Sequence, residues 1–381
     1  MINVKNMGKY RIVVSAVNLV EGGTLTILQN CLSAFSDFVN RNQEYEVIAI
    51  VNDKKRCFYP NIHYIELKWP KKKWIYRIYC EYFYFNRLSK RLKAYLWFSL
   101  HDITPNVTAE IRAVYCHNPT PFYNPAIVDI RYNYKEWLFA LFYRYLYRIN
   151  IDKNTYVIVQ QNWIRNEFSN MFPLRKKQII VAPPVYKEKE VLTINVSSAN
   201  DRKYLFFFPS FPRTFKNFEV ICQACSILDK EGVDGYRVIL TIDGNENRYS
   251  AYVYEKYKLN ENIDFCGLLS RDKVFALYES ANCLIFPSKL ETWGLPISEF
   301  ALYGKPMIVA DLPYAHETAA GLSDISFFNP NDSAELALRM KEIMEGDFSN
   351  FGKVPSINIL SPFVTSWEML FNYLLKDLRI E

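Results

Sequence analysis

Short apolar runs that alternate with helical patterns constrain the fold of this chain more than any other feature of its sequence. Runs such as YRIVVSAVN at residues 10–18 and YEVIAIVN at residues 45–52 are rich in β-branched side chains, which is typical of buried strands in a parallel sheet. Stretches with helical periodicity separate these runs. Strands that alternate with helices predict right-handed βαβ units and therefore doubly wound parallel sheets.

The alternation of strands and helices occurs twice along the chain. The first series ends at the double proline of KQIIVAPP, a polar stretch follows, and the second series begins at YLFFFPS. With 381 residues, half of them apolar, the chain exceeds the size of one ordinary core. We therefore predict an α/β protein with two Rossmann-like domains at residues 1–183 and 201–360, a linker at 184–200, and a C-terminal helix within 361–381 that returns to the first domain.

The cysteines and the N-terminus indicate a cytoplasmic protein. The eight cysteines lie mostly in apolar runs, which indicates reduced thiols rather than a disulfide framework. The first residues contain no long apolar segment followed by a cleavage site, and no window of about 20 residues is both apolar and uncharged. We expect neither a signal peptide nor a transmembrane helix.

The stretch ETWGLPISE places two acids, Glu291 and Glu299, eight positions apart after the predicted strand ANCLIFPS. Pro296 suits the first turn of a helix, so Glu291 falls on the loop and Glu299 on the helix. Ligands of open parallel sheets bind beyond the carboxyl ends of the strands, and the amides at a helix N-terminus favour an anion. Two acids around an anion site suit a nucleotide sugar. The residues between the acids that we expect to contact it are Thr292, Trp293, Gly294 and Leu295.

The longer stretch FPSKLETWGLPISEFALYGKPMIVAD resembles the E-x7-E signature of GT-B fold retaining glycosyltransferases of family 4. The resemblance covers nearly the whole second half of the chain and more weakly the first half. It implies two domains that face a central cleft, with the nucleotide sugar bound by the C-terminal domain and the acceptor by the N-terminal one. It also implies that Glu291 contacts the donor sugar and that Glu299 contacts the ribose hydroxyl groups.

A second part of the resemblance lies in FPSFPRTFKNFEVICQA, where family members carry an arginine and a lysine. Arg213 and Lys216 occupy these places. Cations fixed there would stabilise the charge that develops on a diphosphate leaving group. The sequence contains no Asp-x-Asp motif, so we expect a metal-independent enzyme with no cofactor. Family members often have glycine after the lysine, whereas this chain has Asn217.

Glycines at the ends of predicted strands suggest further donor contacts. Gly244 and Gly267 would allow close approach of the backbone to the ligand, with the segment around residues 265–268 beside the base. In the first half, Gly22 and Gly23 resemble the glycine-rich loop that family members place near the donor phosphates or the acceptor. A generic tight turn is the alternative for each of these glycines.

Two histidines follow predicted strands of the first half. His117, in the sequence HNP, resembles the H-x-P of some family members, where the histidine lies beside the transferred sugar and could assist removal of a proton from the acceptor. His101 and Asp102 could orient His117 or substitute for it. A structural role is the alternative for both histidines.

Basic residues alternate with aromatic ones in two windows, residues 68–97 and 131–149. This texture suits the headgroup level of an anionic bilayer. Packing into a core and binding to nucleic acid are the alternatives, and we expect no nucleic acid partner.

Together these features predict a hexosyltransferase-type glycosyltransferase that works at the inner membrane face. It would move a sugar from a nucleotide diphosphate to an oligosaccharide or lipid-linked glycan in the synthesis of a bacterial surface polysaccharide such as O-antigen or capsule. Two alternatives are a catalytically silent, membrane-associated partner that binds nucleotide sugars and a nucleotide-sugar epimerase or phosphorylase of the same fold. The sequence does not identify the donor base, the sugar or the acceptor.

Overall fold

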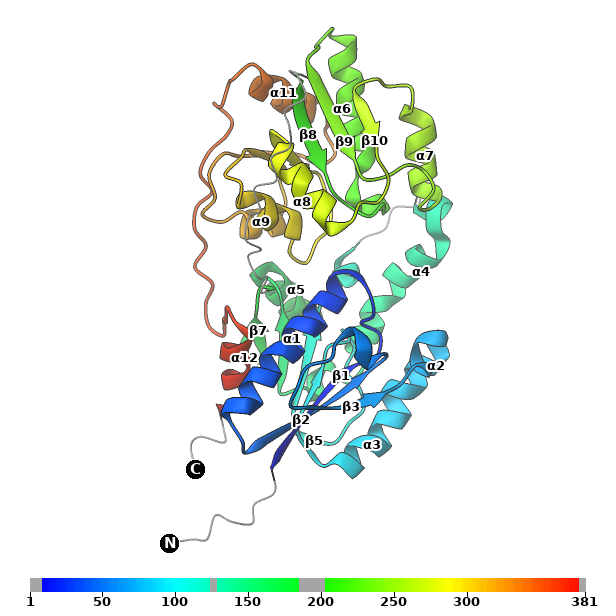
Figure 1. Cartoon of the computed structure of the whole chain (residues 1–381), viewed down its shortest axis with the longest axis vertical. Helices are drawn as coiled ribbons and strands as arrows, with labels where there is room; N and C mark the ends of the chain where they lie inside the picture. The colour runs from blue at the N-terminus through cyan, green and yellow to red at the C-terminus, as the bar shows by residue number, and fades with distance from the viewer. Residues whose placement is uncertain (1–8, 124–128, 185–202, 377–381) are drawn as a thin grey trace. The chain divides into compact units, whose positions relative to one another are not determined.

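The computed structural model of the chain describes residues 9–123, 129–184 and 203–376. Contacts within the chain divide it into two compact units, which are coloured by residue number in Figure 1. The first unit comprises residues 1–122, 142–187 and 359–381, and the second comprises residues 123–141 and 188–358. From residue 185 onward, the predicted linker lies outside the described residues.

The described part of the first unit contains a seven-stranded parallel sheet in the order β3-β2-β1-β4-β5-β6-β7. Its strands are β1 (Tyr10–Ala16), β2 (Tyr45–Val51), β3 (Ile62–Glu66), β4 (Ala94–Ser99), β5 (Ala109–Cys116), β6 (Tyr156–Val159) and β7 (Ile179–Val181). The edge strand β3 was not among the predicted strands.

Helices cover both faces of this sheet, as the alternation predicts. They are α1 (Gly22–Arg41), α2 (Trp74–Tyr79), the π-helical turn η4 (Cys80–Tyr84), α3 (Phe85–Leu92), α4 (Asp129–Arg148), α5 (Asn162–Met171) and α12 (Trp367–Leu374). Side chains alternate along β1: Ile12 and Val14 join the core under α1 and α12, whereas Val13 joins the core under η4 and α3. Helix α4 begins in the second unit and ends in the first.

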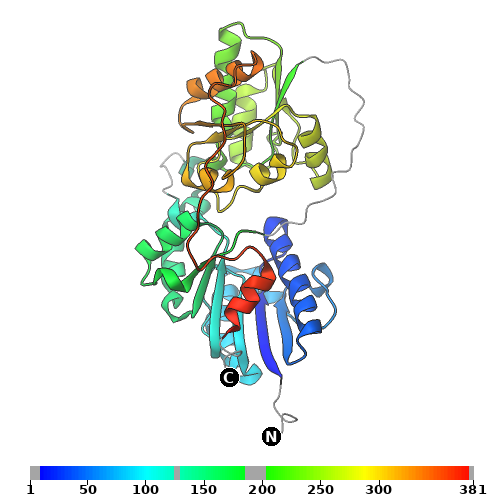
Figure 2. The same cartoon turned by 90° about the vertical axis from the view of Figure 1, so that its left-hand side faces the viewer.

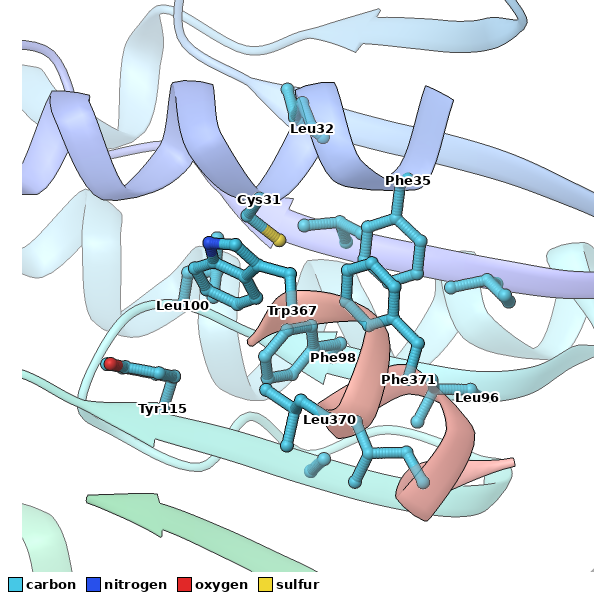
Figure 3. Close-up of a cluster of buried hydrophobic side chains, with 14 of the residues drawn as sticks. Cys31, Leu32, Phe35, Leu96, Phe98, Leu100, Tyr115, Trp367, Leu370 and Phe371 are labelled. Atoms are coloured by element: carbon cyan, nitrogen blue, oxygen red, sulfur yellow. The ribbon is translucent and has the colours of Figure 1, made fainter. Parts of the chain in front are cut away.

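The C-terminal helix α12 belongs to the core of the first unit. It lies beside α1 against the sheet (Figure 2), and its Phe371 ring stacks on Phe35 with 3.7 Å between the ring centroids (Figure 3). Upstream of the helix, Phe363 forms a parallel bridge with Val181 at the edge of β7. The predicted return of this helix to the first domain is confirmed.

The described part of the second unit contains a six-stranded parallel sheet in the order β10-β9-β8-β11-β12-β13. Its strands are β8 (Tyr204–Phe208), β9 (Tyr236–Leu240), β10 (Ile263–Phe265), β11 (Cys283–Phe286), β12 (Met307–Ala310) and β13 (Ile325–Phe328). The edge strand β13 was not predicted from the sequence.

Helices also cover both faces of the second sheet. They are α6 (Phe218–Lys230), α7 (Arg248–Tyr257), α8 (Arg271–Ser280), α9 (Leu295–Ala301), α10 (Pro313–Thr318) and α11 (Ser333–Met344). Neighbouring residues of β8 point to opposite faces, because Phe208 packs on Phe218 of α6 while Phe207 packs on Tyr278 of α8. The two doubly wound parallel sheets predicted from the sequence are confirmed. None of the described helices combines the length and the hydrophobicity needed to cross a membrane.

Candidate functional site

The loop between β11 and α9 and the start of α9 contain ETWGLPISE, the stretch for which the sequence predicts a nucleotide-sugar site. Gly294 precedes the helix and has φ +86°, in the left-handed region that favours glycine. A Cβ at this position would lie 3.3 Å from Ile297 Cδ1 and 3.4 Å from Phe286 Cε1, so the loop is closely packed as well as sharply turned. The bend separates Glu291, on the loop, from Glu299, inside the helix. This is the placement that the sequence predicts for the two acids.

The Lys216 ammonium group donates a hydrogen bond to the Glu291 carboxylate and forms an ion pair with it. Lys216 ends the 3-10 turn η8 (Thr214–Lys216), which follows β8, so the pair joins the loops after two neighbouring strands. A backbone hydrogen bond supports the same arrangement, because Lys289 N donates to Phe215 O at 2.7 Å. The side chains of Lys216 and Glu291 are 18% and 15% exposed, so water screens their attraction only partly.

Asn217, where family members often have glycine, adopts a left-handed backbone with φ +63°. Asparagine tolerates this region better than most residues. Its buried side chain donates from Nδ2 to Pro330 O at 2.7 Å and to Pro287 O at 3.3 Å. The departure from glycine is therefore accommodated by the backbone and adds two tethers to the turn after Lys216.

Arg213 lies on the surface at the start of the η8 turn, with its guanidinium 6.0 Å from the centroid of the Phe215 ring. The structure thus brings Arg213, Lys216 and Glu291 to one edge of the second sheet. This edge holds the carboxyl ends of β8 and β11, where open parallel sheets bind ligands.

Glu299 is only 7% exposed, and both of its carboxylate oxygens accept hydrogen bonds. Arg271 Nη2 donates to Oε1 at 2.8 Å, and the Tyr278 hydroxyl group donates to Oε2 at 3.1 Å. Burial raises the pKa of Glu299, and the nearby Arg271 guanidinium opposes this rise. Sequence reasoning missed both partners. Their only signal is position, since both lie on α8, which follows the predicted strand at residues 263–267.

The other predicted residues of this loop are engaged in local contacts. The Trp293 indole nitrogen donates to Ser298 Oγ at 2.9 Å, and the Trp293 carbonyl accepts from the Thr318 hydroxyl group. Thr292 is half-buried, and Leu295 is the first residue of α9. These contacts tie the loop to α9 and α10.

Two predicted glycines lie at the ends of β9 and β10 and have positive φ angles, +92° for Gly244 and +68° for Gly267. A Cβ on Gly267 would lie 2.9 Å from Asp243 Oδ2, so these two strand ends approach closely. The Gly244 amide donates to Glu246 Oε2 at 3.2 Å. A groove of about 550 Å³ lies beside this region, lined in part by Phe265 and Cys266 of the segment predicted to flank the base and by Leu269 just after it.

In the first unit, His117 follows β5 and is 9% exposed. Its Nε2 lies 2.9 Å from Leu100 O, so the neutral ring carries its proton on Nε2 and leaves Nδ1 as an acceptor. Burial lowers the pKa of His117, although the nearby Asp102 carboxylate opposes this effect. A neutral ring with one lone pair is the form that a proton acceptor requires.

Asp102 contacts the backbone next to His117 rather than its ring. Its Oδ1 accepts from His117 N at 2.5 Å, from Asn118 N at 3.0 Å and from the Tyr147 hydroxyl group at 3.1 Å. Asp102 has φ +70°, a region uncommon for residues other than glycine. The structure therefore gives Asp102 a role in the shape of the loop that carries His117.

His101 is 1% exposed, and its Nε2 accepts from Val17 N at 3.0 Å. Burial lowers the pKa of His101 well below its usual value, so the ring is neutral with its proton on Nδ1. His101 thus contacts the β1–α1 loop five residues before Gly22.

The two glycines predicted in the first half lie at the start of α1. Gly22 begins this helix with φ +61°, and a Cβ on Gly22 or Gly23 would meet no atom within 4 Å.

Comparisons with known protein families, sequences and structures all find glycosyltransferases. Residues 189–353 match the family of glycosyl transferases group 1. The O-antigen chain mannosyltransferase RfbU of Salmonella typhimurium is 19% identical over 257 residues, covering 66% of this chain and 67% of RfbU. A glycosyltransferase from Rickettsia africae aligns with a TM-score of 0.64 at 15% identity over 98% of this chain and all of that chain. The HepE protein of Anabaena, in complex with UDP-glucose, aligns with a TM-score of 0.58 at 11% identity over 97% of this chain and all of that chain.

The fold is GT-B. The matched family range covers nearly all of residues 188–358 of the second unit, but not its residues 123–141, and it contains all the donor-site residues predicted in the second half of the chain.

Proposed function

We propose that this chain is a metal-independent, retaining glycosyltransferase of the hexosyltransferase type. It would transfer a sugar from a nucleotide-diphosphate donor to a glycan acceptor in the synthesis of a bacterial surface polysaccharide such as O-antigen or capsule. The observation that carries the proposal is the Lys216–Glu291 pair at the carboxyl edge of the second sheet. The match to glycosyl transferases group 1 and the similarity to an O-antigen mannosyltransferase support it.

The Lys216–Glu291 pair suits diphosphate chemistry in two ways. The largely buried Lys216 ammonium group, together with the exposed Arg213 guanidinium, stabilises the negative charge that the leaving nucleoside diphosphate gains. Glu291 holds the ammonium group in place before the donor binds, so little reorganisation is needed during the reaction. This assigns to two side chains the charge stabilisation that a bound metal ion supplies in other transferases.

The proposed reaction keeps the configuration at the anomeric carbon. The bond from the anomeric carbon to the diphosphate oxygen breaks, and the acceptor oxygen forms its new bond on the same face. The acceptor proton passes to the departing phosphate, and the neutral His117 ring lies in the unit expected to bind the acceptor. A covalent glycosyl-enzyme adduct trapped by mass spectrometry would contradict this route.

Thermal-shift screening against UDP-, GDP-, dTDP- and CMP-sugars tests donor binding, since a ligand that binds only the native state raises the midpoint of unfolding. We expect one class of nucleotide sugar to raise it and to be consumed when acceptor is added. Glu291→Gln and Lys216→Met should abolish transfer. Lys289→Met, an exposed lysine on the same loop, is the matched control and should retain it. A thermal shift without transfer would instead identify a silent nucleotide-sugar-binding protein.

We further propose that the acceptor is lipid-linked and that the chain binds the inner membrane face. Helix α2 and turn η4 expose large apolar side chains: Trp74 is 45% exposed, Ile75 68%, Tyr79 47% and Phe83 61%. Three consecutive exposed lysines at residues 71–73 precede them. Exposed aromatic and basic residues on one helix favour adsorption to an anionic bilayer.

Helix α4 supports the same proposal with a second exposed stripe, spaced by three or four residues so that it follows one helix face. The stripe contains Ile130, Tyr134, Leu138, Phe142 and Tyr145. Co-sedimentation with phosphatidylglycerol vesicles, and not with phosphatidylcholine vesicles, is the expected result. Phe83→Ser should weaken it, whereas Leu259→Ser, at an 89% exposed leucine of the second unit, should not. Equal binding to both kinds of vesicle would contradict an electrostatic contribution.

A further inference from the structure

Arg77 of α2 and Glu81 of η4, which have no role in the site described above, form a buried charged cluster in the first unit. The cluster also contains His101, which follows β4, and it contacts Val17 and Asn18 of the β1–α1 loop. We propose that Arg77 is a positioning residue that fixes the β1–α1 loop in front of Gly22 and Gly23. This inference rests on the proposed function in one respect, namely that the loop borders the substrate.

The Arg77 guanidinium contacts a partner on each of its sides. Its Nη2 donates to His101 O at 2.8 Å. Because arginine can only donate, the Asn18 amide turns its oxygen toward the guanidinium and accepts from Nε at 2.8 Å and from Nη1 at 2.7 Å. The Trp74 ring lies against the guanidinium, with 5.2 Å from Cζ to the ring centroid. One planar group thereby holds two separate loops, and lysine has no comparable fork.

His101 makes the attachment of the β1–α1 loop double. Its carbonyl oxygen accepts from Arg77, while its ring accepts from Val17 N at 3.0 Å. Two consecutive loop residues, Val17 and Asn18, are therefore fixed by the same pair of side chains. Only three residues separate Asn18 from Gly22, so little slack remains between this attachment and the start of α1.

Glu81 explains why a permanent cation is needed at this place. Its side chain is completely buried, and its two oxygens have no hydrogen-bond partner among the described residues. Arg77 Nε lies 3.9 Å and His101 Nε2 lies 3.8 Å from Oε1. Since His101 Nε2 already accepts from Val17, Arg77 is the group that supplies positive charge to the buried carboxylate. Glu81 also lies on a π-helical turn, a feature frequent at functional sites.

Hydrogen exchange of the unliganded protein tests the proposal directly. Arg77→Lys keeps the charge near Glu81 but loses the fork, so the amides of residues 17–24 should exchange about tenfold faster. Amides of β5 and α12 should be unchanged. Arg87→Lys, an exposed arginine of α3, is the control and should exchange like the wild type. Unchanged exchange at residues 17–24 in Arg77→Lys would overturn the proposal, and so would equal acceleration across the whole first unit.

A second variant separates the hydrogen bonds from the charge. Asn18→Ala removes the partner of Nε and Nη1 and leaves Glu81 and Arg77 together, so it should loosen the same loop amides. In the double variant Asn18→Ala, Arg77→Lys, the loop amides should exchange little faster than in Arg77→Lys alone, because the Asn18–Arg77 hydrogen bonds are lost in both single variants. Full additivity of the two effects would contradict a shared contact.

Steady-state kinetics distinguish a positioning role of Arg77 from a role in stability alone, because only the positioning role changes KM while kcat is kept. Once the donor is identified, Arg77→Lys should raise the KM for either the donor or the acceptor about tenfold and keep kcat within about twofold of the wild-type value. Arg87→Lys should change neither constant. Wild-type KM and kcat in a variant with a loosened loop would overturn the positioning role. If the wild-type protein transfers no sugar, the proposed function fails, and hydrogen exchange still decides whether Arg77 fixes the loop.

Discussion

Substitution of Asn217 separates the energy of a strained backbone from that of two buried hydrogen bonds. Both glycine and alanine remove the bonds to Pro330 O and Pro287 O, each of which contributes about 0.5–1.5 kcal/mol. Glycine accepts the left-handed φ of +63°, whereas the Cβ of alanine adds about 1–2 kcal/mol there. We expect Asn217→Gly to lower the free energy of unfolding by about 2 kcal/mol and Asn217→Ala by about 1 kcal/mol more.

Urea-induced unfolding followed by tryptophan fluorescence measures both changes. Asn150→Gly is the matched control, since Asn150 is also left-handed, with φ +62°, but its side chain makes no capping hydrogen bond. This control should be neutral or slightly stabilising. Asn217→Gly more stable than the wild type would refute the role of the side-chain bonds. Equal stability of the two Asn217 variants would refute the contribution of the backbone.

Three further predictions concern the cores and the strand ends. Phe371→Ala should lower the free energy of unfolding of the first unit by about 3–5 kcal/mol, measured by urea denaturation, because the ring is fully buried and stacks on Phe35. Burial raises the pKa of Glu81 from 4.5 to about 7, so the folded state binds more protons than the unfolded state between these values, and the stabilisation present below pH 4.5 is lost as pH rises through about 7. This effect changes the free energy of unfolding by at most about 3 kcal/mol between pH 5 and pH 8. Glu81→Gln should remove it, as measured by urea-induced unfolding at a series of pH values in this range. Gly267→Ala, where the new Cβ would meet Asp243 at 2.9 Å with φ +68°, should lower the unfolding midpoint and weaken nucleotide-sugar binding in the thermal-shift screen.

Local patterns predicted the two acids at the end of one strand, and the family resemblance singled out Arg213 and Lys216 at the end of another. Glu291 follows a predicted strand and Lys216 follows another, so both were expected at the carboxyl edge of one sheet. Their direct pairing could not be predicted, because the two residues are 75 positions apart and meet only after β8 and β11 become neighbours. Glu299 shows the same limit, since its partner Arg271 comes from a helix 28 positions earlier.

The sequence by itself determined the class of fold, because periodicity of apolar residues is a local property that each strand and helix carries independently. It did not reveal the edge strands β3 and β13, which are five and four residues long. Only the tertiary structure decided that residues 123–141 group with the second unit and that Arg77 joins α2 to the β1–α1 loop. Such contacts depend on how distant elements pack, and the free energy of burying a charged side chain is set by partners that no local pattern specifies.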